Sequence, residues 1–395
     1  MLGLAIRIAE CQGIHRESTL VKCTVFEAEM RRRLWWCLML YDTRMGEKAD
    51  HKDPSLAPTW DCRQPINCND SDLWPDMKEP PISRSRSTEA LYSVIRAEIA
   101  DHIRNSEWFL DFSNPRLKPL AKELPDGGSI DVLEQRIQRD YLRYCDMNNP
   151  IHFFTVGATK AHLIRSRLFE HFARSLNNSG PQTEDQRDHG ISIALDYLMN
   201  DQELVGSPLC RGYLWYLQSY FPFPAYMHLI QDLQRRPLGR LADRVWSVMH
   251  TNYVARFDAY FKNFQGDHSK TLTPLFIMFS RTVNLAWETL QKASEDPGSL
   301  ATPGIILEIE RRKMEALAAG FNPGQPFQCQ SAHSPVPSSS VSTDTQSQNG
   351  NSMPFVVQGT FDSFMMNTER MPYPSFVSPD TFTYDPSQFD WFLQH

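Results

Sequence analysis

The sequence predicts an all-α protein: a large, bundle-like helical domain over residues 1–320, followed by a disordered tail over residues 321–395. Apolar residues recur at helical spacing through almost all of the first part, with no alternating strand pattern and no hairpin turn. The composition then changes, because residues 322–395 hold 9 Pro and 12 Ser but one Leu and no Ile. Such a segment cannot bury enough surface to offset the entropy lost on ordering.

Two helices are predicted near the N-terminus. Residues 2–12 form an apolar helix that Gly13 ends in a left-handed conformation. The next helix begins after Thr24, whose hydroxyl caps the backbone amide of Glu27, and it runs to Asp42. Its second half is apolar on all sides, which predicts a helix surrounded by protein.

The same helical spacing of apolar residues predicts the helices in the rest of the domain. An irregular stretch rich in Pro, Asp and Asn covers residues 46–86. Helical spacing then returns, with Leu91, Ile95, Ile99 and Ile103 on one stripe. Further helices are predicted around residues 133–144 and over residues 151–176, 184–200, 209–220, 224–236, 238–263, 273–293 and 303–319.

Composition excludes several classes of protein. With 40 basic and 47 acidic residues the net charge is −7, so the surface as a whole is not a polyanion-binding sheath. No apolar run reaches the roughly 18 residues of a membrane-spanning helix, and the N-terminus lacks the pattern of a secretory signal. Eight cysteines without a C-x-x-C pair indicate reduced thiols in a nuclear or cytosolic protein.

The sequence lacks the usual marks of an enzyme. It contains no P-loop, no dinucleotide fingerprint, no zinc-protease motif and no nucleophile elbow. The acidic run Glu184–Asp188 is similar to a metal–diphosphate motif of helical terpene synthases, but no second ligand motif accompanies it. Acidic residues also favour the first turn of a helix, and this is the interpretation we prefer. We expect neither a catalytic site nor a bound cofactor or metal in this chain.

Scattered Cys and His residues are weak metal candidates. Cys62 and Cys68 have five residues between them and follow His51 in the sequence, whereas a zinc site needs four ligands, usually in tighter pairs. We therefore interpret the two cysteines as unligated. Three histidines among apolar helical residues are interpreted as hydrogen-bonded core or boundary residues rather than ligands: His162, His171 and His228.

Basic clusters are interpreted as solvated or paired faces. Arg31–Arg33 precede Trp35 and Trp36, which could be taken for a nucleic-acid patch. However, Arg31 and Arg33 each follow a Glu by four residues, so ion pairs along the helix explain them better. The same preference for solvated segments applies to Arg84–Ser87, which could accept a phosphate, and to Arg235–Arg236 and Arg311–Lys313, which could aid nuclear import.

The most aromatic part of the domain lies at residues 213–227. Its bulky side chains could line an apolar pocket for a small molecule at a helix break, although core packing is the interpretation we prefer. This region supports the alternative function, an all-α small-molecule-binding protein or enzyme. The pocket residues would be Trp215, Tyr216, Tyr220 and Phe223.

The tail ends in a segment that alternates acidic and bulky apolar residues. A short helix there would place Phe389, Phe392 and Leu393 on one face, with Trp391 beside them and Asp390 keeping the segment soluble. Segments of this kind fold into a hydrophobic groove of a partner and are typical of transcriptional activation regions. The other interpretation is that this segment docks on its own domain.

The N-terminal strings resemble a known family. GIHRE (Gly13–Glu17), EAEMRRRLWWCLMLYD (Glu27–Asp42) and PINCNDSDL (Pro65–Leu73) are similar to the fungal-specific transcription factor domain, the middle homology region of zinc binuclear cluster regulators. The resemblance covers residues 1 to about 75. The positions that carry it are His15, Arg16, Glu29, Arg31, Arg32, Arg33, Trp35, Trp36, Asp42, Pro65, Asn67 and Asp70.

The resemblance implies a nuclear regulator whose helical domain restrains or transmits activation, and often a metabolic or secondary-metabolite pathway as its target. The tail segment itself predicts transcription machinery or co-regulators as partners, and the aromatic region leaves open a small-molecule effector that would change access to the tail. The family's module of six closely spaced, zinc-binding cysteines is absent from the sequence, so zinc and DNA contact are expected only through that missing module. The chain is either truncated or a version without its own DNA reader.

Overall fold

The computed structural model describes residues 2–48, 56, 58–84, 86–124, 128–177, 182–263 and 274–318. Within these ranges the chain forms thirteen α-helices, several short 3-10 turns and no β-strand, which confirms the predicted all-α fold. The predicted tail lies outside the described residues. No helix of the described part is long and apolar enough to cross a bilayer.

The first six helices occupy the N-terminal third of the chain. Gly13, with a φ of 67°, follows the first of them as predicted, and the Thr24 hydroxyl accepts the Glu27 amide at 3.2 Å before the third. Their bounds are α1 (Leu2–Cys11), α2 (Glu17–Leu20), α3 (Val25–Lys48), α4 (Leu91–Asn105), α5 (Glu107–Ser113) and α6 (Ile130–Asp140).

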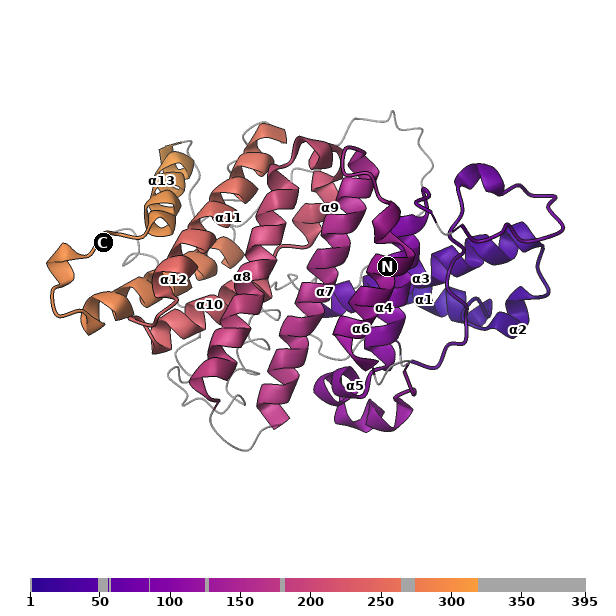
Figure 1. The fold of residues 1–395 in the computed structure, drawn as a ribbon, viewed down its shortest axis with the longest axis horizontal. Coiled ribbons are helices and arrows are strands. Elements are labelled where there is room, and N and C mark those ends of the chain that lie inside the picture. Colours follow the sequence, from indigo (N-terminus) through magenta and orange to yellow (C-terminus); the bar gives the residue numbers. More distant parts are fainter. Residues whose placement is uncertain are drawn as a thin grey trace, which may run out of the picture.

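The remaining helices form the larger part of the molecule. The bounds are α7 (Pro150–Asn177), α8 (Glu184–Gly206), α9 (Leu214–Ser219), α10 (Phe223–Arg235), α11 (Ala242–Asn263), α12 (Pro274–Ala293) and α13 (Gly304–Ala318). Helix α8 packs against α7, α10 and α11, and α13 packs against α11 and α12. Figure 1 shows α7, α8 and α11 side by side between the indigo N-terminal helices and the orange α13.

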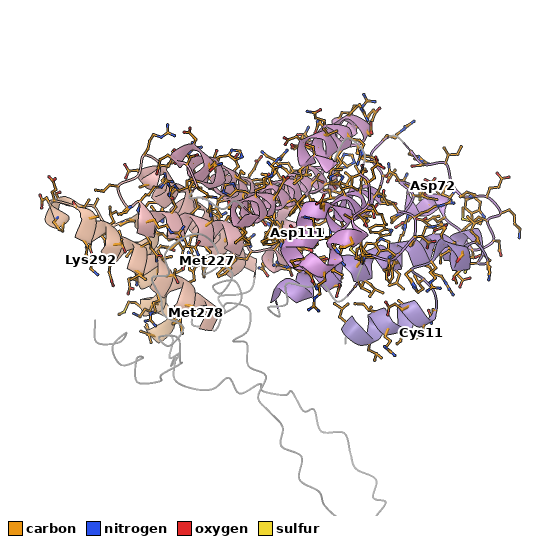
Figure 2. All side chains as sticks on the ribbon, turned by 90° about the horizontal axis from the view of Figure 1, so that it is seen from below. Cys11, Asp72, Asp111, Met227, Met278 and Lys292 are labelled. Carbon is orange, nitrogen blue, oxygen red and sulfur yellow. The ribbon has the colours of Figure 1, made fainter. Side chains whose placement is uncertain are left out.

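The described residues form four separate apolar cores, and two of these belong to the helical body and to the N-terminal helices. The larger lies among α7, α8 and α10–α13, and it is built mainly from aliphatic residues such as Leu168, Leu198 and Leu229. The second lies between α1, α3 and the loop after α3, where Trp35, Trp36 and other side chains are buried. Figure 2 shows that these two cores lie in different parts of the molecule. Met227 of the larger core lies in the middle of the helical body, whereas Cys11 lies on α1 at one side.

Several expected elements differ from the structure. Helices α2 and α5 were not expected, because each spans less than two turns and shows little periodicity. The helix predicted over residues 209–220 is a 3-10 turn, Pro208–Tyr213, followed by the short α9. The helix predicted from residue 238 begins at Ala242, after a turn in which the Gly239 amide bonds the carbonyl of Arg236 at 2.8 Å.

The second half of α3 is not surrounded by protein, which corrects the sequence-based expectation. Trp35 and Trp36 are buried, but Leu34 is 47% exposed and Tyr41 is 50% exposed on another side of the same helix. Helix α3 packs against α1, α2, α4 and its own following loop, and these contacts leave Leu34 and Tyr41 half-exposed.

Candidate functional site

Glu29 is the centre of the residues that resemble the family motif. Its carboxylate is 0% exposed and accepts the Arg33 Nε at 3.2 Å and the backbone amide of Ile66 at 3.0 Å. Burial raises the pKa of this carboxyl, while the Ile66 amide and the nearby arginines act to lower it. A charge in this position therefore serves to hold the loop at Ile66 onto α3.

The three consecutive arginines are all engaged with acidic side chains. Arg31 pairs with Glu27 at 2.7 Å, which confirms the predicted pairing along the helix. Arg33 reaches beyond Glu29 to the Asp70 carboxylate at 3.0 Å. Arg32 pairs with the carboxylate of Glu17 on α2. The run Arg31–Arg33 thus connects α2, α3 and the loop, and its charges are compensated.

The aromatic and acidic residues later in α3 hold the same loop. The Trp36 indole nitrogen donates to the carbonyl of Arg63 at 2.8 Å. Asp42 is buried and accepts the backbone amide of Leu56 at 3.1 Å. The rings of Trp35 and Trp36 both meet Trp60 edge-on, with centroids 6.1 and 6.3 Å away.

Asn67 fixes the other end of the loop. Its amide nitrogen donates to the carbonyls of Arg84 and Arg86, and its oxygen accepts the Thr88 hydroxyl at 2.6 Å. Pro65 is buried beside it. Since a buried backbone group without a partner is costly, these bonds explain how an irregular loop packs closely.

His15 and Arg16 lie at the edge of the same region. The His15 ring stacks at a tilt on Trp35, with centroids 5.6 Å apart, and its Nε2 accepts the Arg16 Nε at 3.1 Å. The motif positions therefore meet in one place around α3. Their carboxylates are bound to arginines or backbone amides, so this region has an architectural role rather than free reactive groups.

The acidic run at Glu184 begins α8, as preferred from the sequence. Thr183 is the N-cap, and its side chain and that of Gln186 bond each other's backbone amides at 3.2 and 2.9 Å. Asp188 pairs with Arg236 at 3.0 Å and with Arg240 at 2.6 Å. The arginines lower the pKa of the Asp188 carboxyl.

Cys62 and Cys68 are both buried but point to different partners. The Cys62 thiol lies 3.6 Å from the carbonyl of Arg63, and the Cys68 sulfur lies 3.4 Å from Arg33. Burial raises the pKa of the Cys62 thiol to about 12. His51 lies outside the described residues, and within the described ones no group of three or more His, Cys, Asp or Glu could hold a metal ion.

His171 and His228 lie together in the helical body. Their ring centroids are 5.8 Å apart, and both Nε2 atoms face Gly190, where a Cβ would meet them at 2.5 and 2.8 Å. Burial lowers the pKa of His171 to about 4 and of His228 to about 3, so both rings are neutral near pH 7. Glycine at position 190 is required because any larger residue would displace them.

The other basic candidates are also paired. Arg84 bonds Asp72 at 2.6 Å, and Ser85 lies outside the described residues. Arg311 bonds Glu308 at 2.6 Å. Arg236 bonds Asp232 at 2.7 Å.

The predicted pocket residues are only partly brought together. The rings of Tyr216 on α9 and of Tyr220, the residue directly after α9, have centroids 4.7 Å apart. Trp215 touches Tyr216 edge-on at 5.8 Å but is 63% exposed. Phe223, at the start of α10, packs instead against the larger apolar core.

Residues from other helices complete the group around Tyr216. Tyr92 on α4 donates its hydroxyl to that of Tyr216 at 2.7 Å, and the His162 Nε2 on α7 lies 3.2 Å from the Tyr92 oxygen. Arg96, one turn after Tyr92, donates to the Tyr220 hydroxyl at 2.9 Å. One signal was present in the sequence: Arg96 stands between the apolar Ile95 and Ala97.

This group carries positive charge. Burial and the charges of Arg96, Arg165 and Arg44 lower the pKa of His162 far below its ordinary value, so that ring is neutral. Burial raises the pKa of Tyr92 to about 12, and that of Tyr216 rises further. The phenols therefore stay protonated, and the guanidinium of Arg96 remains charged among neutral rings.

Comparison with known proteins identifies the family of the N-terminal part of the chain. Residues 1–111 match the fungal specific transcription factor domain, the family that the N-terminal motifs indicate. No solved structure matches the chain.

Its curated relatives are fungal regulators. The chain is 43% identical over 325 residues to Transcriptional regulator AacuB of Aspergillus aculeatus, which covers 81% of the chain and 43% of that protein. It is 34% identical over 417 residues to Transcriptional regulator nsrM of Aspergillus novofumigatus, covering 100% of the chain and 54% of the relative. The Aurofusarin cluster transcription factor aurR2 of Gibberella zeae is 28% identical over 291 residues, covering 73% of the chain and 42% of the relative. The chain thus spans about half the length of the curated relatives it matches.

These relatives are named as transcription regulators and not as enzymes. The enzyme alternative is therefore dropped. The segment that carries Phe389, Asp390, Trp391, Phe392 and Leu393 lies outside the described residues.

Proposed function

We propose that the chain is part of a fungal transcription regulator of the zinc-cluster type that controls a set of biosynthetic genes. The observation that supports this most directly is the similarity to AacuB over 81% of the chain. Two further relatives carry names that refer to biosynthetic clusters, for aurofusarin and for pyriculol. The protein would act in the nucleus.

In this proposal residues 1–320 form the regulatory domain and residues 321–395 carry the activation function. Residues 322–395 contain six acidic residues and one basic residue, together with 11 aromatic residues. Acidic segments with interleaved aromatic residues bind co-regulators or the transcription machinery by folding into apolar grooves. DNA contact, and any zinc, would belong to a cysteine module outside this sequence.

Fusion of residues 322–395 to an unrelated DNA-binding domain tests the output of the tail. We expect activation of a reporter gene, and loss of most of that activity when Phe389, Trp391 and Phe392 are replaced by Ala. Replacing Ser338, Ser339 and Ser340 by Ala in the same fusion is the matched control and should leave activity unchanged. A fusion that is expressed but inactive would refute the activation role.

A second candidate function is the sensing of a small-molecule effector by the helical domain. The observation that favours it is the group formed by Tyr92, Arg96, His162, Tyr216 and Tyr220. It joins residues of α4, α7 and α9 and keeps a guanidinium among aromatic rings. Saturable binding of a ligand to the full chain that is lost on Tyr216→Ala, while Trp215→Ala retains it, would support this role.

A further inference from the structure

One side of α3 carries large apolar side chains that are exposed to solvent. Met30, Leu34 and Tyr41 are 44%, 47% and 50% exposed, and the side chain of Cys37 between them is exposed as well. Their spacing of four, three and four residues places all four on one side of the helix, opposite the fully buried Met39. These four residues are called the α3 stripe. Helix α3 lies among the N-terminal helices, at the end of the molecule opposite α13 (Figure 1).

The α3 stripe differs from other exposed apolar residues of the described part because no charge interrupts it. On α13, Leu307 and Met314 are exposed at a similar spacing, but the ion-paired Arg311 stands between them on the same side of that helix. Between its first and last residue the α3 stripe contains only apolar side chains. Continuous exposed apolar surfaces of this kind mark sites where proteins bind one another.

The spacing of the α3 stripe is the same when it is read in either direction. If two copies of α3 pack antiparallel, Met30 of each lies opposite Tyr41 of the other, and Leu34 lies opposite Cys37. A contact between two identical chains requires such reciprocity, because a residue that meets a second one must also be met by it across the twofold axis. The α3 stripe therefore fits a second copy of itself.

The charged residues at the two ends of the α3 stripe favour the antiparallel orientation. In the register just given, Glu27, one turn before Met30, lies opposite Arg44 of the other copy, one turn after Tyr41. The Glu27 side chain is 46% exposed, and Arg44 lies 4.8 Å from the ring centroid of Tyr220 in its own chain, which keeps its charge at this end of α3. A parallel pair would instead bring Glu27 against Glu27 and Arg44 against Arg44. Opposite charges across a contact fix its register and orientation, whereas like charges oppose it.

We propose that two copies of this chain form a dimer through the α3 stripe, with the two α3 helices antiparallel. The twofold axis crosses the helices level with the bond between Trp35 and Trp36, whose rings stay in the core of their own chain. The contact extends over three turns of each helix, or about 16 Å. The dimer is independent of the regulatory function proposed above.

Sedimentation equilibrium of the full chain tests the dimer. We expect a species of twice the mass of one chain. Leu34→Glu places two carboxylates at the centre of the contact and should raise the dissociation constant of the dimer roughly tenfold or more. Because Leu34 is 47% exposed in the single chain, the substitution leaves the fold intact, which circular dichroism checks. The matched control is Leu307→Glu on α13, where the side chain is 59% exposed, and it should leave the dimer unchanged.

Cross-linking of the unaltered chain gives a second measurement that needs no substitution. Packed helices lie about 8–10 Å apart, so a short bis-maleimide can join the two Cys37 thiols across the contact. We expect dimers linked through Cys37 and not through Cys11, which is exposed on α1. The orientation is tested by mixing Met30→Cys chains with Tyr41→Cys chains, both also carrying Cys37→Ser. The antiparallel pair should link position 30 of one chain to position 41 of the other, as identified by peptide mass spectrometry.

A monomeric full chain, a dimer that Leu34→Glu leaves intact, or cross-links through Cys11 would each overturn the proposal, and failure to link positions 30 and 41 would overturn the antiparallel arrangement. A monomer that dimerises only when Phe389, Trp391 and Phe392 are replaced by Ala would assign the α3 stripe to the chain's own tail. A monomer that this replacement leaves unchanged would assign it to a different protein, and both results contradict a dimer. None of these outcomes bears on the activation role of the tail, which the reporter fusion tests separately.

Discussion

Different kinds of contact stabilise the N-terminal region and the helical body of this protein. Around α3 an irregular loop is held by buried polar side chains, with Glu29, Asp42 and Asn67 each bonded to the loop backbone. In the body, α8 is enclosed by other helices whose contacts are largely aliphatic. Helices satisfy their own backbone groups, so the body needs few such side chains, whereas a loop must find its partners elsewhere.

This difference explains why a family motif can be recognised in the sequence around α3 but not in the helical body. A side chain that must bond one particular amide can be replaced by few others, so Glu29 and Asn67 belong to a recognisable string. Aliphatic contacts tolerate exchanges that keep volume and pattern, so the body shows only helical spacing. The predictions below test this contrast in order of expected effect.

Removing the buried carboxylate should have the largest effect. Glu29→Ala leaves Arg33 without its buried partner and the Ile66 amide without an acceptor, and we expect the free energy of unfolding to fall by roughly 3–5 kcal/mol. The midpoint of urea denaturation of the full chain measures this. A loss below about 1 kcal/mol would show that the polar network does not hold the loop.

A cavity in the body should cost nearly as much. Leu229 on α10 is fully buried, so Leu229→Ala should lower the free energy of unfolding by about 2–5 kcal/mol. Leu229→Met, which nearly conserves volume, should cost less than about 1.5 kcal/mol. If the two substitutions cost the same, the body would not depend on volume as this comparison requires.

Acid should weaken the body through His228. Its pKa is held near 3 in the folded state by burial, by His171 and by Arg235 and Arg236, against about 6.5 when unfolded. The folded state therefore favours the neutral ring, and its stability is complete above pH 6.5 and declines as the pH falls toward 3. At pH 5 the loss is about 2 kcal/mol.

The pH series is measured by denaturation between pH 7.5 and 5. His228→Gln should make the decline shallower, and more so than the same change at the half-buried His152 at the start of α7. An equally steep decline in His228→Gln would contradict the assignment.

The smallest effect is expected at the surface of α3. Glu27 pairs with Arg31 but both side chains are partly exposed, at 46% and 28%. Glu27→Ala should cost less than about 1 kcal/mol, in contrast to Glu29→Ala two residues away on the same helix. A loss at Glu27 as large as at Glu29 would remove the distinction between buried and exposed charges.

Local features could be predicted from the sequence, and contacts between distant segments could not. The cap at Thr24, the left-handed Gly13 and the Glu27–Arg31 pair depend on residues within one turn. The bonds from Glu29 to Ile66 and from Asn67 to Arg84 join segments that share no periodicity. They follow only once the fold has brought α3 and the loop together.

The candidate ligand group shows the same limit. Tyr216 and Tyr220 were found because aromatic residues cluster near them in sequence, but Tyr92, Arg96 and His162 come from two other helices. Phe223 was misassigned to this group, because the chain turns between α9 and α10 and places its ring in the larger core.

The most direct test of the whole account is genetic. Deletion of the gene that encodes this chain, followed by sequencing of transcripts, should change the expression of a contiguous group of biosynthetic genes together and leave most other genes unaffected. Unchanged transcripts throughout the neighbouring genes and the genome, under conditions where the protein is expressed, would contradict its assignment as a regulator.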